Sequence, residues 1–378
     1  MGAPAMASVI TRGLPVDELP TPVQVVDLGK MEANIRRMQS SIALTGAKLR
    51  PHIKTHKTPE IADLQLKNGA SGIAVAKVAE AEVFAAAGFD DIVVAYPVVG
   101  AEKWRRIAEL ARSCRITVNV ESDVAARGLS AAAVQAGTVI FAQVDIDTGF
   151  HRCGVFPSDA EDLCRVILGL PGLELDGITT HRSAFFPEHG GRSPAVLGKE
   201  EGEIMVALAE RLRAAGIPIR EVAVGSTPTS AAAAAVPGVT EVRAGTYVFG
   251  DLIMAGLGIM TREEIALTIH CTVVSRPTPR RATVDGGMKT FSGEAFPSQP
   301  KYLKGQGEAV DLPVFLEALT EEHGLVALTP DVQPAVGDRI AFFPNHVCTT
   351  VNLSEELVGV RNGRVEAVWR VAARGKRT

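Results

Sequence analysis

The stretch GIAVAKVAEAEVFAAAGFDDIVVAY, residues 72–96, contains two short apolar runs joined by one helical segment. In that segment apolar residues recur at three- and four-residue spacing, and Gly88 follows as a helix-ending residue. The flanking runs GIAVAK and DIVVAY are rich in valine, isoleucine and alanine, which is typical of strands buried on both faces of a parallel sheet. The stretch therefore predicts a strand–helix–strand unit.

The same alternation extends over residues 48–249, where eight runs have the character of strands and helical segments lie between them. The runs are KLRPHIKT (48–55), GIAVAK (72–77), DIVVAY (91–96), RITVNV (115–120), VIFAQVDID (139–147), ELDGITTH (174–181), EVAVGST (221–227) and EVRAGTYVF (241–249). Eight such repeats are typical of a (β/α)8 TIM-type barrel, although a doubly wound sheet shows the same alternation until the count closes. Active sites of these barrels lie at the C-terminal ends of the strands. We therefore expect one face to hold the polar residues near those ends: Lys54, Asp147, His181, Ser226 and Thr227.

The pattern changes near residue 260, where short alternating strands with Gly, Pro and Asn-Gly turns replace the helical segments. The clearest hairpin runs from ELVGVR into NGRVEAVWRVA through Asn362 and Gly363. The early run TPVQVVDL (21–28) is a candidate to pair with these strands. We predict an α/β barrel over residues 26–258 and an all-β C-terminal domain over residues 259–378, joined by residues 1–25.

The composition narrows the possible partners. Of the 378 residues, 46% are hydrophobic and 22% charged, and the formal net charge is −4 without a long basic run, which argues against nucleic acid and leaves a small molecule as the expected ligand. The alanine-rich stretch around Pro237 is too short and too interrupted to predict a membrane span. Five scattered cysteines without a CxxC pair indicate reduced thiols, and no export signal opens the chain, so we expect a cytoplasmic protein.

The segment KLRPHIKTHKTPEIA (48–62) places two lysines at the end of the first barrel strand. A lysine in a partly dry pocket can lose its proton and form a Schiff base with a carbonyl compound. In the competing interpretation, Lys54 and Lys57 are solvated loop residues, since lysines are rarely buried. The small-residue turns AVGSTPTS (223–230) and RAGTYVFGD (243–251) follow the last two strands, where barrels commonly bind phosphate. A lysine that can form a Schiff base and a nearby phosphate site together imply pyridoxal phosphate as the cofactor.

Five motifs carry a resemblance to a known family: RPHIKTHK (50–57), VDIDTGFHRCGV (144–155), GSTPT (225–229), AGTYVFGD (244–251) and PNHVCTTVNL (344–353). In this order they resemble the D-threonine aldolase and D-serine dehydratase family, whose members use pyridoxal phosphate on a fold like that of bacterial alanine racemase. The resemblance runs from about Thr21 to the carboxyl end. It implies an N-terminal barrel, a C-terminal β domain, a homodimer, a D-amino acid substrate and a divalent metal beside the cofactor.

The resemblance also implies roles for individual residues. Lys54, and not Lys57, matches the Schiff-base lysine. Arg152 matches the arginine against the cofactor ring, where a cation would hold the charge of the phenolate oxygen, although a surface salt bridge would also suit an arginine. His181 aligns with the histidine after the sixth strand and is expected to serve catalysis and cofactor binding. The phosphate and ring pocket is matched by residues whose glycines would equally suit tight turns: Gly225, Ser226, Thr227, Gly245, Thr246 and Tyr247.

A candidate metal pair lies in PNHVC, where a strand would place the side chains of His346 and Cys348 on the same face. Imidazole and thiolate are zinc ligands, yet two ligands fall short of the four that a structural zinc site needs. A buried thiol beside a core histidine is the alternative for such a pair. The family's metal pair matches these two residues, and an open coordination sphere would suit Lewis-acid work on a hydroxyl group.

The identity of the second ligand favours one reaction over another. Within the family His-x-Asp is associated with aldolases and manganese, and His-x-Cys with dehydratases and zinc. Cys348 therefore favours zinc, with manganese or magnesium as alternatives, and elimination of the β-hydroxyl group to give a 2-oxo acid and ammonia, as in a D-serine or 3-hydroxy-D-aspartate dehydratase. Retro-aldol cleavage to glycine and an aldehyde is the alternative. Two other classes are less favoured. An amino-acid racemase would need no metal, so His346 and Cys348 argue against it. A non-catalytic pyridoxal phosphate carrier would need no β domain, so the C-terminal segment argues against that interpretation.

The segment THRSAFFPEHGG (180–191) departs from the family pattern. His181 aligns, but Arg182, Phe185 and Phe186 replace small or polar residues. Arg182 is a low-ranking candidate for binding a second substrate carboxylate, since a guanidinium group binds carboxylate in a fork; the alternative is that it points to solvent. Three further histidines have no assigned place: His151, His189 and His323.

Overall fold

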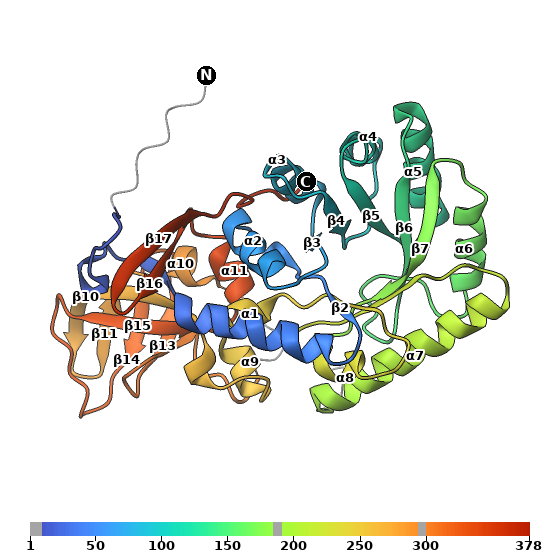
Figure 1. The fold of residues 1–378 in the computed structure, drawn as a ribbon. Coiled ribbons are helices and arrows are strands. Elements are labelled where there is room, and N and C mark those ends of the chain that lie inside the picture. The colour runs from blue at the N-terminus through green and yellow to red at the C-terminus, as the bar shows by residue number, and fades with distance from the viewer. Residues whose placement is uncertain (1–9, 184–190, 294–299) are drawn as a thin grey trace, which may run out of the picture. The chain divides into compact units, whose positions relative to one another are not determined.

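The computed structural model describes residues 10–183, 191–293 and 300–378 (Figure 1). The chain divides into two compact units. One comprises residues 35–247 and 375–378, and the other comprises residues 1–34 and 248–374. The Phe185, Phe186 and His189 positions lie outside the described residues.

The first unit is built on eight parallel strands, one for each run that the sequence predicts. They are β2 (Lys48–Leu49), β3 (Ile73–Val75), β4 (Asp91–Val94), β5 (Arg115–Val120), β6 (Ile140–Ile146), β7 (Leu173–Thr180), β8 (Glu221–Val224) and β9 (Glu241–Val242). Each strand pairs in parallel with its neighbour in the order β2-β9-β8-β7-β6-β5-β4-β3. A bridge between His52 and Ala74 closes the ring, with the Ala74 N–H donating to the Pro51 carbonyl at 2.8 Å. The barrel is therefore confirmed, and the doubly wound alternative is excluded.

Helices surround the outer face of this sheet, as Figure 1 shows. They are α2 (Pro59–Lys67), α3 (Val78–Ala86), α4 (Ala101–Leu110), α5 (Asp123–Ala136), α6 (Ala160–Leu168), α7 (Pro194–Ala214) and α8 (Ser230–Ala234). Local sequence sets their ends: Ser122 caps α5 by accepting the Ala125 N–H at 3.3 Å, and Gly137 ends it in the left-handed conformation. Helix α1 (Leu28–Ala43) contains the division between the two units.

The second unit is a nine-stranded mixed sheet in the order β11-β14-β13-β12-β15-β10-β1-β16-β17. Its strands are β1 (Val23–Asp27), β10 (Leu267–Thr278), β11 (Arg281–Val284), β12 (Gly307–Ala309), β13 (Phe315–Leu319), β14 (Gly324–Ala327), β15 (Arg339–Pro344), β16 (Glu356–Arg361) and β17 (Arg364–Arg370). Strand β1 runs antiparallel to β10 and parallel to β16, so the predicted pairing of the early run with this domain is confirmed. The predicted hairpin is also present, with positive φ at Asn362 (50°) and Gly363 (73°).

Three short helices complete the second unit: α9 (Leu252–Gly256), α10 (Met288–Phe291) and α11 (Val347–Val351). The core under β1 contains Val23, Val25, Val358, Val360 and Val365, the alternating apolar positions of three adjacent strands. Among the residues that the structure describes, no helix has the length and apolar character needed to cross a lipid bilayer.

Candidate active site

A cavity of about 610 Å³ lies at the C-terminal ends of the barrel strands. Every one of the eight strands contributes to its lining, with residues near its C-terminal end or in the segment that follows. Lys54 follows β2, Glu121 follows β5, His181 follows β7 and Gly225 follows β8. The cavity thus occupies the place where the sequence predicts the active site, and its size suits a cofactor with a small substrate.

The two lysines of the opening segment have different surroundings. Lys54 belongs to a 3-10 turn (Ile53–Thr55) and lines the cavity, and its N–H donates to the His52 Nδ1 at 3.4 Å. Lys57 is buried and forms an ion pair with the buried carboxylate of Glu80 at 3.1 Å. The same carboxylate accepts the Ala76 N–H at 2.6 Å. The ion pair holds Lys57 as part of the fold, whereas Lys54 lines the cavity, as does Lys103 from α4.

Two histidines that line the cavity are neutral. Burial, together with the charges of Lys54 and Arg152, lowers the pKa of His181 to about 3. Burial and Lys54 likewise hold the pKa of His52 well below its usual value. The Nδ1 of His181 lies 3.2 Å from the Gly225 carbonyl oxygen, which can only accept a hydrogen bond, so Nδ1 carries the proton. The Nε2 of His181 therefore holds the lone pair and can accept a proton or a hydrogen bond.

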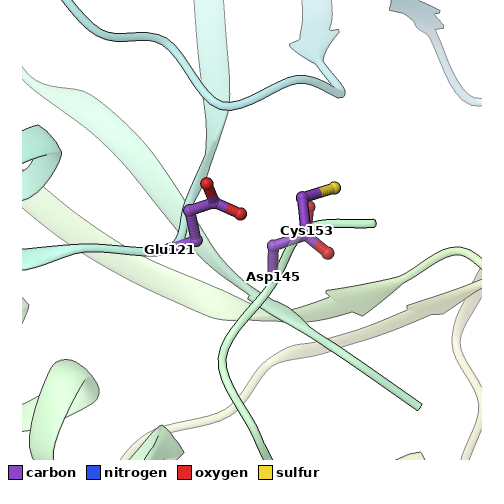
Figure 2. A group of neighbouring side chains, drawn as sticks. All are labelled: Glu121, Asp145 and Cys153. Atoms are coloured by element: carbon purple, nitrogen blue, oxygen red, sulfur yellow. The ribbon is translucent and has the colours of Figure 1, made fainter. Parts of the chain in front are cut away.

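Glu121, Asp145 and Cys153 form a cluster in the cavity that the sequence analysis did not anticipate (Figure 2). One ligand atom from each lies within 4.8 Å of the others, a spacing that a metal ion would also satisfy. Burial raises the pKa of Asp145 to about 6, despite a hydrogen bond from Asn119 at 3.1 Å. Burial also raises the pKa of the Cys153 thiol.

Local contacts account for much of this cluster. The Glu121 carboxylate accepts the Gly154 N–H at 2.6 Å, and the charge of Arg152 favours the ionised forms of Asp145 and Cys153. The cluster therefore has its own cation in Arg152. Arg152 lines the cavity with an exposed side chain, and its role against the cofactor ring stays a prediction.

Asp147 holds the loop that carries Arg152. Its Oδ1 accepts the N–H groups of Gly149, Phe150 and His151 at 2.8, 3.0 and 3.0 Å, and its Oδ2 lies 2.8 Å from His151 Nδ1. These backbone bonds outweigh burial and lower its pKa. Asp147 directly follows β6, at the end of the barrel where it was expected, but it does not line the cavity because its carboxylate accepts the hydrogen bonds of this loop.

The residues expected to bind phosphate come together from two loops. The Tyr247 N–H donates to Thr227 Oγ1 at 3.2 Å, which joins the turns after β8 and β9. Ser226 Oγ donates to the Arg182 carbonyl at 3.1 Å, and Tyr247 Oη accepts from Gln65 Nε2 at 2.9 Å. At Gly245 a β-carbon would lie 2.7 Å from the His52 carbonyl, so only glycine fits. Of the six predicted residues, Gly225 alone lines the cavity, and the turns supply N–H and hydroxyl groups suited to a phosphate.

The remaining candidates lie elsewhere. Arg182 is buried rather than solvent-exposed, lies outside the cavity lining, and has its Nη1 at 3.2 Å from Glu200 Oε2. His151 pairs with Asp147, and His323 lies in the β unit with its Nδ1 at 3.5 Å from Thr320 Oγ1. Of these three residues, only Arg182 is the chain neighbour of His181 at the end of β7.

The candidate metal pair belongs to the β unit. Strand β15 ends at Pro344, His346 is the N-cap of α11, and Cys348 lies in the first turn of that helix. The prediction that the two residues lie on a strand is therefore wrong, because the chain turns into a helix directly after Pro344. They are nevertheless close: Cys348 hydrogen-bonds His346 and, with Asp251, outweighs burial and holds the pKa of His346 well above its usual value.

Asp251 is a further residue of this pair that the sequence analysis missed. Its Oδ2 lies 3.0 Å from His346 Nδ1 and accepts the Val347 N–H at 3.1 Å, while its Oδ1 accepts the Met254 N–H at 2.9 Å. The residue is fully buried. A carboxylate on one imidazole nitrogen directs the other nitrogen to a metal, and this is a common arrangement around metal-binding histidines. Imidazole, thiol and supporting carboxylate thus fit a divalent cation, and the aspartate in AGTYVFGD was the signal for it.

Comparison with known proteins places these features in context. Residues 26–252 match the family described as alanine racemase, N-terminal domain, and residues 266–360 match the putative serine dehydratase domain. The chain is 36% identical to D-threo-3-hydroxyaspartate dehydratase of Delftia sp. (strain HT23), covering 88% of this chain and 92% of the relative. It is also 36% identical to D-threonine aldolase of an Arthrobacter species, covering 96% and 95%. The crystal structure of D-threonine aldolase from Filomicrobium marinum superposes with a TM-score of 0.89 at 29% identity, covering 98% and 100%.

Proposed function

The chain belongs to the alanine-racemase-like family that contains the D-threonine aldolases and the 3-hydroxyaspartate dehydratases, and from that premise we propose that it is a lyase dependent on pyridoxal phosphate and a divalent metal. Its substrates would be β-hydroxy-D-amino acids. The observation that carries the proposal is the placement of Lys54 in a cavity bounded by all eight strand ends, while Lys57 is held in an ion pair.

Pyridoxal phosphate, bound through Lys54, would act as an electron sink for the charge that develops at the substrate Cα. Arg152 would lie against the ring, and the turns after β8 and β9 would hold the phosphate. The Lys54 Nζ is the group we assign to removal of the Cα proton. His181, neutral and with its lone pair on Nε2, is available to accept a hydrogen bond or a proton from cofactor or substrate.

His346 and Cys348 would hold the divalent cation, which as a Lewis acid would weaken the bond to the substrate's β-hydroxyl group. Asp251 would orient His346. A thiolate ligand favours zinc over manganese or magnesium, so we propose zinc. On the same ground we propose dehydration, with a 2-oxo acid and ammonia as products.

Retro-aldol cleavage to glycine and an aldehyde is the second candidate, because the Arthrobacter aldolase is as similar to this chain as the Delftia dehydratase is. A racemase is disfavoured by the presence of the His346 and Cys348 pair, and a non-catalytic carrier by the β unit that holds it. We propose in addition that the enzyme is a cytoplasmic homodimer, as the composition and the family resemblance lead us to expect.

The decisive experiment incubates the protein, loaded with pyridoxal phosphate and with zinc or manganese in parallel, with D-serine, D-threonine and D-threo-3-hydroxyaspartate. Products are identified by mass spectrometry. We expect ammonia and a 2-oxo acid, with D-threo-3-hydroxyaspartate preferred if Arg182 binds the second carboxylate. Glycine with an aldehyde or glyoxylate would establish the aldolase instead. The Arg182→Ala variant tests the preference: an unchanged ratio of acidic to neutral substrates would exclude that role.

A further inference from the structure

Glu201 joins the ends of two barrel strands from outside the sheet. It lies on α7, is fully buried, and its Oε1 accepts two backbone N–H groups. One is the N–H of Arg182, directly after the end of β7, at 3.2 Å, and the other is the N–H of Gly225, directly after β8, at 3.1 Å. A single carboxylate oxygen therefore ties together the two strand ends that carry His181 and the first residue of the GSTPT turn.

The same contacts reach a cavity group. Gly225 donates its N–H to Glu201 and accepts the His181 Nδ1–H through its carbonyl oxygen at 3.2 Å. Arg182, whose N–H also bonds Glu201, is the chain neighbour of His181. Glu201 thus holds His181 through both of these residues and supports the carbonyl that keeps the proton on Nδ1.

Two glycines allow α7 to approach closely enough for these bonds. A β-carbon on Gly198 would lie 2.4 Å from the Thr229 carbonyl oxygen, and one on Gly202 would lie 2.9 Å from the Ala233 carbonyl oxygen. Both distances are too short for any side chain without movement of the backbone. Gly198 and Gly202 lie four residues apart, about one helical turn, and Glu201 lies between them, so the close approach of α7 brings its carboxylate against the turn after β8.

The second oxygen of Glu201 has a different environment. Oε2 is buried and has no hydrogen-bond partner among residues 10–183, 191–293 and 300–378. Burial raises the pKa of Glu201 to about 7, although the nearby Thr229 hydroxyl and the Gly225 and Arg182 N–H groups favour the ionised form. The charged group that faces it is the Arg182 guanidinium, which itself lies 3.2 Å from Glu200. Residues 225–234, which form the turn and α8, contain no titratable side chain.

We propose that Glu201 is a positioning residue that holds the ends of β7 and β8 and takes up a proton at Oε2 when a phosphate dianion binds to the turn after β8. The inference rests on the proposed function, because pyridoxal phosphate supplies that dianion. An ionised carboxylate behind the turn repels the phosphate, whereas the neutral acid does not. Protonation at Oε2 leaves Oε1 free to accept both N–H groups, so the strand ends keep their support.

The test measures ligand binding to the full-length apoprotein rather than turnover. Pyridoxal phosphate and pyridoxal, which lacks the phosphate, are titrated against the wild type, Glu201→Gln, Glu201→Ala and Glu203→Gln at pH 6, 7 and 8. Glutamine retains one acceptor oxygen and has no proton to gain or lose. Glu203 lies on the same helix but is exposed, with its carboxylate 3.6 Å from Lys199, so Glu203→Gln is the matched control. Circular dichroism shows that each variant is folded.

We expect the affinity of the wild type for pyridoxal phosphate, divided by that of Glu201→Gln, to fall about tenfold between pH 6 and pH 8, because the free carboxyl must first be protonated. Glu203→Gln follows the wild type. For pyridoxal, the affinity of the wild type divided by that of Glu201→Gln should not change with pH. At pH 6 Glu201→Gln binds pyridoxal phosphate within about threefold of the wild type, whereas Glu201→Ala binds it at least about tenfold more weakly, because both N–H groups lose their acceptor.

Each contrary result has a distinct meaning. The proton uptake is overturned if the affinity ratio of wild type to Glu201→Gln for pyridoxal phosphate does not change with pH. It is also overturned if the ratio for pyridoxal changes equally with pH. Either result leaves the proposed function in place. Glu201→Ala binding as tightly as the wild type at every pH overturns the positioning role. A wild-type protein that binds neither compound through Lys54 overturns the proposed function, and the inference fails with it.

Discussion

The two ends of the barrel use charged residues in opposite ways. At the N-terminal end of the strands, a cavity of about 310 Å³ is lined by charges that are paired with one another. Arg50 lies 2.7 Å from Glu241 and 2.9 Å from Asp91, and Arg115 lies 3.0 Å from Asp176. Each lysine and arginine that lines this cavity has a carboxylate partner, so this end contributes stability.

At the C-terminal end the cavity is lined by two amines, two neutral imidazoles, two guanidinium groups and two carboxylates. Burial keeps His52 and His181 uncharged, and it raises the pKa of Asp145 to about 6. Groups that bind and transfer protons are commonly those whose pKa is shifted by burial, rather than those whose charge is neutralised by an ion-pair partner. The difference between the ends teaches that charge alone does not mark the site; protonation shifted by burial does.

The largest effect is expected at Lys54. Lys54→Ala should lower kcat/KM by about 10³-fold or more, because it removes both the attachment point of the cofactor and the proposed base. The visible absorbance of the cofactor bound through this lysine should disappear as well. Steady-state kinetics and an absorbance spectrum of the loaded protein check both results.

Lys57 provides the contrast within the same segment. Lys57→Met leaves the buried Glu80 carboxylate without its cation, which should lower the free energy of unfolding by about 3–5 kcal/mol. The variant should retain the cofactor absorbance below its unfolding temperature. If Lys57→Met lost the absorbance while folded and Lys54→Ala kept it, the assignment of the two lysines would be reversed.

At the opposite end of the barrel, Glu241→Gln should destabilise the fold by about 3–5 kcal/mol near neutral pH, since Arg50 and Arg243 lose a shared carboxylate. These two arginines outweigh burial and lower the pKa of Glu241 to about 2. The stability from Glu241 is therefore present above pH 4.5 and is lost as the pH falls from 4.5 towards 2. Urea unfolding at several pH values should show the gap between wild type and variant closing in acid.

In the β unit, Asp251→Asn should weaken metal binding about 10- to 100-fold, because the carboxylate that orients His346 is lost. Metal titration with zinc, with the exposed Asp331→Asn as a control, measures the change. Equal affinities for Asp251→Asn and the control would show that the carboxylate supports only the start of α9 and the backbone of Val347.

The smallest effect concerns acid stability. The pKa of His181 is about 3 in the folded protein, below its usual value of 6.5, so its contribution to stability is present above pH 6.5 and is lost as the pH falls below that value. His181→Asn, which can still donate to the Gly225 carbonyl, should therefore gain about 2 kcal/mol relative to the wild type between pH 7 and pH 5. A constant difference between the two proteins across this range would contradict a buried, neutral His181.

The barrel could be predicted from the sequence because each repeat carries its own information. Short valine- and isoleucine-rich runs and helical spacing are local patterns, and all eight runs became strands. The Asn362–Gly363 hairpin was predicted for the same reason, since only a few residues accept positive φ. The strand assigned to His346 and Cys348 was wrong because a two-residue spacing does not distinguish a strand from the first turn of a helix.

The candidate site was predicted only in part. Motifs identified Lys54, Arg152 and His181, which line one cavity, but they did not reveal Glu121, Asp145 or Glu201. Glu121 and Glu201 stand outside the quoted motifs, and Asp145 lies within one that drew attention to other residues; the surroundings of all three come from partners distant along the chain. Asp147 lies at a strand end, as expected, but its hydrogen bonds belong to the loop that follows, so it does not line the cavity.

The sequence by itself determined the alternation of strands and helices, the pairing potential of the early strand, the reactive lysine segment and the His-x-Cys pair, because these depend on neighbours along the chain. Tertiary structure alone decided which lysine is ion-paired, which imidazoles are neutral, and which carboxylates lie behind the strand ends. Those properties arise from burial and from contacts between residues far apart in sequence, and free energies of desolvation are set by such surroundings rather than by residue type.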